Sequence, residues 1–143
     1  MKQITDDYCS FEIAKLLKEK GFDGECRMTY REHDMQMIYY TPNPNNLLNF
    51  TTNREKLEKH SKKQHCDYAL CPTHQMALKW LREVHKLHIY AEPYWPQGDM
   101  RNKMRWQGFV VDLNTINGDS QCYADSPEEA IENRIRFVLE NLI

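Results

Sequence analysis

The sequence predicts an α+β protein in which helices pack on one face of an antiparallel meander sheet. Two observations in residues 72–143 carry this prediction. Amphipathic helical periods with capping signals stand at both ends of the segment, and three short strand-like runs lie between them, separated by turn residues. The expected order there is α-β-β-β-α, and a simpler α-β-β unit is expected in residues 1–50.

The closing helix, over residues 126–142, is the clearest element. Ser126 is a typical N-cap, Pro127 fits the first helical position, and Glu129 follows the cap by three residues, as in a capping box. Apolar residues then recur with the period of one helix face: Ile131, Ile135, Val138 and Leu142.

The opening helix of this half is expected over residues 73–86, with Thr73 as its N-cap after a proline. Four residues form its predicted buried stripe: Ala77, Trp80, Leu81 and Val84. We therefore expect Trp80 to belong to the core.

Three strands are expected between these helices, over residues 88–94, 105–113 and 120–124. The Asn117-Gly118 pair is a strong hairpin signal and predicts the turn before the last strand. An uninterrupted middle strand would put its cations and its apolar residues on the same face. Gly108 is therefore expected to mark a β-bulge that separates them.

The first half of the sequence predicts a helix over residues 10–20, with Ser10 as its N-cap and Gly21 at its end. A hairpin of residues 25–31 and 35–40 is expected to follow. Residues 41–71 are rich in charge and poor in apolar side chains. We interpret them as an exposed connection with at most a marginal helix. The whole chain, 1–143, is expected to form one domain, or one domain with residues 1–50 as an appended α-β-β subunit.

Composition limits the class of protein. The chain has 143 residues, a net charge of −2 and a mean hydropathy of −0.80, and it has no run of 18 apolar residues. Its N-terminal residues contain no apolar segment typical of a signal peptide, so a cytoplasmic location is expected. Five cysteines at irregular spacing fit reduced thiols better than a disulfide framework.

One stretch gathers residue types that bind zinc, namely His60, His65, Cys66, Cys71 and His74. No pair among them has the C-x2-C spacing of zinc sites, so neither a metal nor another cofactor is predicted. Nucleophilic catalysis by a cysteine and a histidine requires that the two meet in space, which the sequence does not show. No residue is therefore nominated as catalytic.

The candidate binding residues bring rings and cations together around one loop: Tyr94, Trp95, Arg101, Lys103, Arg105 and Trp106. This composition is used to stack bases and to hold phosphates. The alternative, which the sequence leaves open, is that the aromatic residues pack the hairpin while the cations are solvated at its tip.

The α-β-β-β-α order of residues 72–143 resembles the topology of double-stranded-RNA-binding domains. The three strands and last helix also resemble HicB-type antitoxin domains, in which a similar Ser-Pro-Glu-Glu-Ala motif opens the helix at Ser126. The RNA-binding family places lysines where this chain has Glu128 and Glu129. That difference argues against binding of duplex RNA.

A longer resemblance is to a family of short, uncharacterised proteins encoded in phages and prophages of gut anaerobic bacteria. It rests on Ser-Phe-Glu-Ile-Ala-Lys-Leu-Leu-Lys-Glu-Lys-Gly-Phe-Asp from Ser10, on Pro72-Thr with Trp80-Leu-Arg-Glu-Val-His, and on the Glu-Glu-Ala motif of the last helix. The resemblance implies a small cytoplasmic accessory protein without catalytic activity, whose partner is a protein. The alternative is a module that binds single-stranded nucleic acid through the 94–106 loop.

Overall fold

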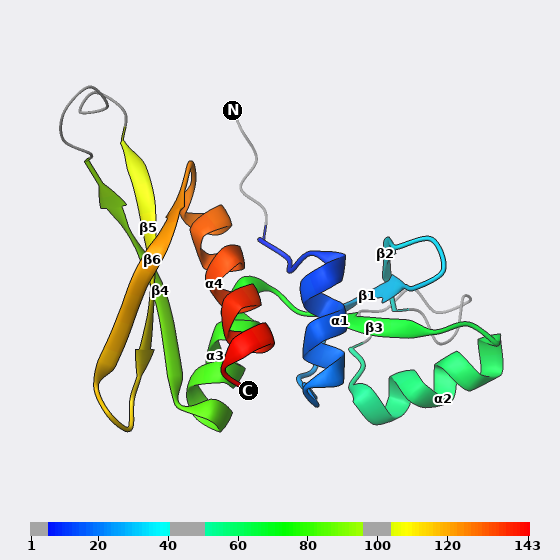
Figure 1. The fold of residues 1–143 in the computed structure, drawn as a ribbon. Coiled ribbons are helices and arrows are strands. Elements are labelled where there is room, and N and C mark those ends of the chain that lie inside the picture. Colours follow the sequence, from blue (N-terminus) through cyan, green and yellow to red (C-terminus); the bar gives the residue numbers. More distant parts are fainter. Residues whose placement is uncertain (1–5, 41–50, 96–103) are drawn as a thin grey trace. The chain divides into compact units, whose positions relative to one another are not determined.

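The fold is taken from a computed structural model of the chain, and the structure describes residues 6–40, 51–95 and 104–143, apart from the side chains of residues 119–122. The chain forms two compact units, Met1–Met76 and Ala77–Ile143. Each unit has its own three-stranded antiparallel sheet (Figure 1). The α+β class predicted from the sequence is therefore confirmed.

The first unit consists of α1 (Phe11–Glu19), β1 (Met28–Arg31), β2 (Gln36–Tyr39), α2 (Arg54–Gln64) and β3 (Tyr68–Cys71). Its sheet has the order β2-β1-β3, with β1 in the centre and antiparallel to both neighbours. The predicted hairpin is confirmed, because β1 and β2 are joined by a tight turn of residues 32–35.

Local capping chemistry sets the bounds of α1 as the sequence predicts. The Ser10 side chain accepts a hydrogen bond from the backbone N–H of Ile13 at 3.3 Å. At the other end Gly21 adopts a left-handed backbone, with φ of 86°, and the N–H of Phe22 donates to the carbonyl of Leu17 at 2.9 Å. Both Leu17 and Phe22 are buried, which fixes the helix against the unit's core.

Within residues 41–71, the exposed, charged helix that the sequence allowed is present as α2, but the interpretation as a connection is wrong for residues 68–71. Residues 54–64 form α2, with Asn53 as N-cap and Leu57 as a buried anchor. Residues 68–71 form β3, which pairs with the whole of β1 and is buried along its length. A strand that is buried on both faces shows no polar alternation, so the sequence pattern did not reveal it.

The second unit contains most of α3 (His74–His85), followed by β4 (Leu87–Tyr94), β5 (Arg105–Asp112), β6 (Asn117–Ala124) and α4 (Pro127–Asn141). The sheet has the order β4-β5-β6, which is the predicted meander. The caps of both helices are also confirmed. Thr73 accepts from the N–H of Met76 at 3.3 Å, and Ser126 accepts from the N–H of Glu129 at 3.1 Å.

Gly108 is the point where α4 crosses the sheet. A methyl group on Gly108 would lie 2.9 Å from the carbonyl oxygen of Ala130 and 2.6 Å from Cγ of Arg134. The close approach of helix and strand therefore requires glycine here. It also shows that the face of β5 that carries Gly108 and the buried Val110 is the face toward α4.

The bulge predicted at Gly108 does not turn the middle strand over. β5 pairs with β4 without interruption from Arg105 to Asp112, and the register shift occurs only between β5 and β6, with the additional residue on β6. Arg105 and Phe109 therefore share a face, as the parity of the sequence indicated. That face is the one opposite α4, so no flip is needed to keep the cation out of the core.

The turn before β6 also differs from the prediction. Asn117 and Gly118 are the first residues of β6 and not the turn. The chain reverses over residues 113–116, where the N–H of Ile116 donates to the carbonyl of Asp112 at 2.7 Å and Ile116 itself has φ of 60°. A β-branched residue rarely takes this conformation, which is why the turn was placed too late.

The predicted stripe of α3 is only partly correct. Ala77 and Leu81 are fully buried, but Val84 is 59% exposed. Trp80 is half-buried and its ring meets that of His85 edge to face, with centroids 4.6 Å apart. The assignment of Trp80 to the core is therefore not confirmed.

Candidate functional site

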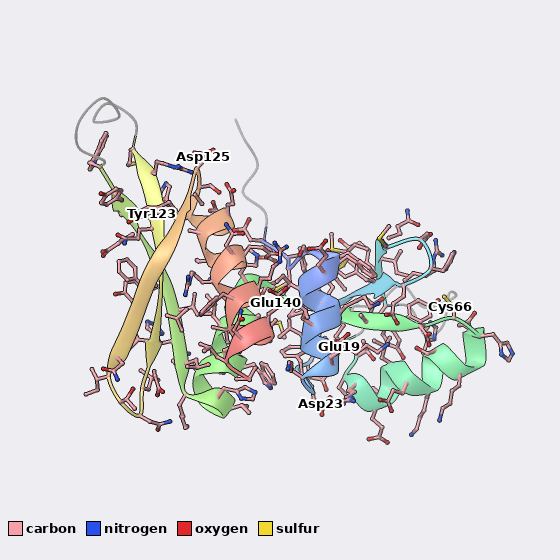
Figure 2. All side chains as sticks on the ribbon, in the orientation of Figure 1. Glu19, Asp23, Cys66, Tyr123, Asp125 and Glu140 are labelled. Carbon is pink, nitrogen blue, oxygen red and sulfur yellow. The ribbon has the colours of Figure 1, made fainter. Side chains whose placement is uncertain are left out.

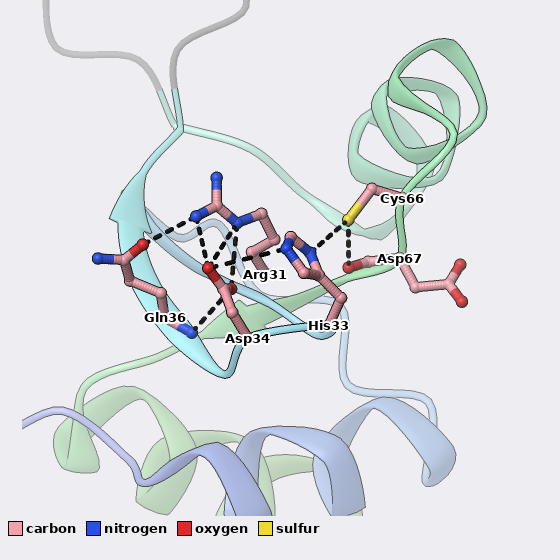
Figure 3. Close-up of polar contacts among 6 residues, drawn as sticks. All are labelled: Arg31, His33, Asp34, Gln36, Cys66 and Asp67. Atoms are coloured by element: carbon pink, nitrogen blue, oxygen red, sulfur yellow. Dashed lines mark hydrogen bonds and ion pairs between the residues drawn. The ribbon is translucent and has the colours of Figure 1, made fainter.

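A cysteine and a histidine that are 33 residues apart in sequence meet in the first unit (Figure 3). His33 lies in the turn between β1 and β2. Cys66 follows the end of α2, where His65 takes a left-handed backbone with φ of 51°. The backbone N–H of Glu32 donates to the carbonyl of Asp67 at 2.9 Å, and this bond holds the turn beside the end of the helix.

The side chains stand in the order thiol, imidazole, carboxylate. The Cys66 Sγ lies 3.4 Å from Nδ1 of His33, and Nε2 of His33 lies 3.9 Å from Oδ2 of Asp34. The thiol is also 3.7 Å from the carbonyl oxygen of Asp67, whose own carboxylate points away from the sulfur in Figure 3. A neutral imidazole with its proton on Nε2 can therefore accept the thiol proton at Nδ1.

Asp34 is held in place and kept charged by Arg31. The guanidinium donates to both carboxylate oxygens, with Nη2 2.6 Å and Nε 3.2 Å from Oδ2 and Nε 3.1 Å from Oδ1. Nη2 also donates to the amide oxygen of Gln36 at 2.8 Å. The hydrogen bonds from Arg31 lower the pKa of Asp34 to about 2, so this carboxylate is ionised when it faces His33.

A cavity of about 470 Å³ lies between α1, α2 and β3, and Cys66 contributes to its wall. The residues with apolar side chains that line it are Ala14, Phe22, Leu57, Tyr68 and Leu70. Its charged lining residues are Lys18, Arg54, Glu58, Lys62 and Asp67. The volume lies within the range of small-molecule sites, and the mixture of apolar and charged groups is of the kind such sites have.

Cys66 also contributes to the wall of a second, more open hollow. It is lined by Lys15, Glu32, His33, His65, Cys66 and Asp67. Cys66 therefore lines two recesses of the same unit. The remaining cysteines whose side chains are described, Cys9, Cys26 and Cys71, are buried.

The second unit offers a different kind of site, on the face of its sheet that is opposite α4. The helix contacts all three strands of this sheet and lies along one side of it (Figure 1). Along β4, Leu87 and Ile89 are buried whereas Tyr90 is exposed, so alternate residues point to opposite faces. Helix α4 lies on the side of Leu87 and Ile89, because Gly108, which it contacts, pairs with Ala91 on that same face.

Aromatic side chains cover the opposite face, which we call the outer face. It is formed by His88, Tyr90, Glu92, Tyr94, Arg105, Gln107, Phe109, Val111 and Tyr123, as the strand register places them. The rings of Tyr90 and Phe109 stack at 4.8 Å with an 8° angle, His88 stacks on Tyr90 at 5.6 Å, and Tyr94 meets Tyr123 at 5.2 Å. Tyr123 is 47% exposed and is labelled in Figure 2.

The structure separates the predicted binding residues. Tyr94 and Arg105 belong to the outer face, and Arg105 forms an ion pair with Asp125 at 3.6 Å. Trp106 lies on the face toward α4, opposite Pro93 and Ala124.

Trp95 follows β4 and is 60% exposed. The other two predicted binding residues, Arg101 and Lys103, lie outside the described residues. The structure thus extends the predicted site along the sheet to Tyr90, Phe109 and Tyr123, which the sequence analysis did not nominate. Their alternation along the strands is the signal that could have found them.

The histidines and cysteines of residues 60–74 take separate places in the structure. The ring of His60 lies between those of Tyr40 and Tyr68, and burial together with Lys63 holds the pKa of His60 below its usual value. The Cys71 thiol donates to the carbonyl of Cys9, far along the chain. Within the described residues, no three of His60, His65, Cys66, Cys71 and His74 converge on one point.

In comparisons with known proteins, no family model matches this chain, and no match was found among curated proteins or solved structures. Among the described residues, no helix has both the length and the apolar character needed to cross a bilayer.

Proposed function

We propose that this chain is a small accessory protein that binds another protein through the outer face of its second unit. The proposal rests on the outer face of the sheet, which lies opposite α4 and is covered by aromatic side chains. Tyr90, Tyr94 and Tyr123 are between 37% and 47% exposed on one side of the same sheet. Monomeric proteins rarely leave such a contiguous patch exposed unless it binds something.

The composition of the outer face favours a protein partner. Tyrosine and phenylalanine dominate its centre, and a tyrosine supplies both apolar area and a hydroxyl for hydrogen bonding. Among the described side chains of this face, the acidic and basic ones are Glu92 and Arg105, which the strand register places at the end that carries Tyr94. Depletion of charge at the centre with enrichment of aromatic residues is typical of protein interfaces. The partner is therefore expected to present an uncharged, largely apolar surface.

The charge balance argues against nucleic acid as the occupant. Residues 77–143 include eight Lys and Arg and ten Asp and Glu. Affinity for a nucleic acid comes largely from cations that neutralise phosphates, and Arg105, a cation of this face, is already paired with Asp125. Stacking on Tyr94 and Tyr123 keeps single-stranded nucleic acid as the alternative occupant, because rings on a sheet face are also used to stack bases.

The proposal is tested by capture followed by reconstitution. The immobilised chain is exposed to a nuclease-treated lysate, a captured protein is identified by mass spectrometry, and its binding to the purified chain is measured by calorimetry. The paired change Tyr90→Ser with Tyr123→Ser is expected to weaken binding by at least about 30-fold, which corresponds to the roughly 2 kcal/mol of an interface hot spot.

The matched control removes apolar area elsewhere in the second unit. Ile116 is 84% exposed in the turn and Val84 is 59% exposed on α3. The paired change Ile116→Ser with Val84→Ser is expected to leave the affinity unchanged. Equal affinity of the Tyr90/Tyr123 variant and the wild type would refute the proposal, and so would submicromolar binding of single-stranded oligonucleotides that this variant loses.

A further inference from the structure

We propose that Cys66, His33 and the adjacent cavity form a thiol site that takes small anionic disulfides and forms a mixed disulfide at Cys66. The proposal is independent of the outer face, since all its residues belong to the first unit. It rests on the contact of thiol and imidazole, on the position of Cys66 in the cavity wall, and on the charges around it.

The first support is the contact itself. The thiolate is the nucleophile in thiol–disulfide exchange, so a reactive cysteine needs a group that removes its proton. His33 Nδ1 stands 3.4 Å from the sulfur, and the ionised Asp34 faces the opposite ring nitrogen at 3.9 Å. The imidazolium that forms when His33 takes the proton therefore has a carboxylate beside it.

The backbone alone would not favour a thiolate at this position. Cys66 follows the C-terminal end of α2, and its N–H donates to the carbonyl of Ser61 at 3.2 Å. The end of a helix that exposes carbonyl groups is the negative end of its dipole. A thiolate at Cys66 thus depends on a nearby cation, and the imidazolium of His33, whose Nδ1 lies 3.4 Å from the sulfur, is suited to supply it.

The other charged groups near the thiol are already engaged or point elsewhere. Lys15 and Lys18 both pair with Glu32, at 3.8 and 2.8 Å. Arg31 is occupied by Asp34, as described above. His65, next to Cys66 in sequence, lines both recesses, and its ring is not the one in contact with the sulfur.

The cavity indicates the class of reagent. Arg54 and Glu58 in its wall pair with each other at 3.3 Å, and Lys18 is shared with Glu32. Among the described residues, the structure shows no ion pair for Lys62, which stands in the same wall. A small molecule with a carboxylate for Lys62 and an apolar portion for the floor near Leu57 and Leu70 fits this lining.

The proposed reaction is a balanced exchange. His33 takes the proton of Cys66, and the thiolate attacks one sulfur of the disulfide. A new bond forms between the Cys66 sulfur and that sulfur while the original sulfur–sulfur bond breaks. The leaving thiolate receives the proton from His33, so the small disulfide and the Cys66 thiol are consumed, the mixed disulfide remains on Cys66, and one small thiol leaves.

The experiment uses the full-length protein and glutathione disulfide, an acidic disulfide. Peptide-resolved mass spectrometry follows the gain of one glutathionyl group at each cysteine with time. Cys66 is expected to react first, while the buried Cys9, Cys26 and Cys71 stay unmodified in the folded chain. His33→Gln should slow the reaction at Cys66 by at least about tenfold, which is less than the roughly hundredfold lower end of general-base effects.

Two controls separate the parts of the proposal. His88→Gln changes a histidine of the second unit that lines neither recess, and it should leave the rate unchanged. Lys62→Gln should slow the reaction with glutathione disulfide and not with the neutral 2-hydroxyethyl disulfide. Circular dichroism verifies that each variant is folded.

Equal rates for the wild type and His33→Gln would overturn the role of the imidazole. A rate at Cys66 no higher than that of a cysteine in a short unstructured peptide would overturn the site as a whole. Equal effects of Lys62→Gln on both disulfides would remove the assignment to anionic reagents.

Discussion

Gly108→Ala should destabilise the second unit, because this glycine lets α4 lie against β5. The added methyl group would stand 2.6 Å from Cγ of Arg134 and 2.9 Å from the carbonyl oxygen of Ala130. The first contact can relax by rotation of a side chain, but the second is with backbone and requires the helix to move. Overpacking of this kind costs about 1–3 kcal/mol.

Gly118→Ala is the matched control, in the neighbouring strand of the same sheet. A methyl group there would lie 3.5 Å from the carbonyl oxygen of Val110 and 3.7 Å from a methyl group of Val111, which are ordinary contacts. Its free energy of unfolding should stay within about 0.5 kcal/mol of the wild type. Urea denaturation followed by circular dichroism measures both variants. If Gly108→Ala costs no more than Gly118→Ala, α4 does not cross the sheet at Gly108, and the assignment of the outer face fails with it.

Three further predictions concern the pH dependence of stability and the capping of a helix. Arg31 lowers the pKa of Asp34 to about 2, so the contribution of Asp34 to stability should be present above about pH 4 and be lost as pH falls towards 2. In Asp34→Asn, the free energy of unfolding should therefore fall less steeply over this acidic range. Burial raises the pKa of Cys26 to about 12, so stability should fall as pH rises from 9 towards 12, and Cys26→Ala should reduce that fall. Ser126→Ala should cost about 1 kcal/mol in urea denaturation, since its hydroxyl caps α4.

The features that the sequence predicts best are those determined by residues close together in the chain. Ser10, Thr73 and Ser126 cap their helices through hydrogen bonds to residues three positions later, so each start can be recognised from a few letters. The meander of the second unit follows from the same local logic of short strands and turns. The turn at Ile116 was misplaced because its conformation is one that the residue type disfavours.

The features that the sequence did not predict depend on contacts between residues far apart in the chain. β3 has four residues next to a highly charged helix, and only its pairing with β1 makes it a strand. Cys66 and His33 meet because one backbone hydrogen bond joins Glu32 to Asp67, and no motif in the sequence marks that contact. Gly108 was recognised as special, but sequence alone could not distinguish a bulge from the close approach of a helix.

Site-specific photocrosslinking tests the central claim most directly. A benzoylphenylalanine is placed at position 123 on the outer face, in place of Tyr123, or at position 116 in the turn, in place of Ile116, which is the more exposed residue of the two. After irradiation in a lysate, we expect one discrete protein adduct from position 123 and none from position 116. Crosslinks to nucleic acid from position 123, or the same protein adducts from both positions, would contradict the account of the outer face as a protein-binding surface.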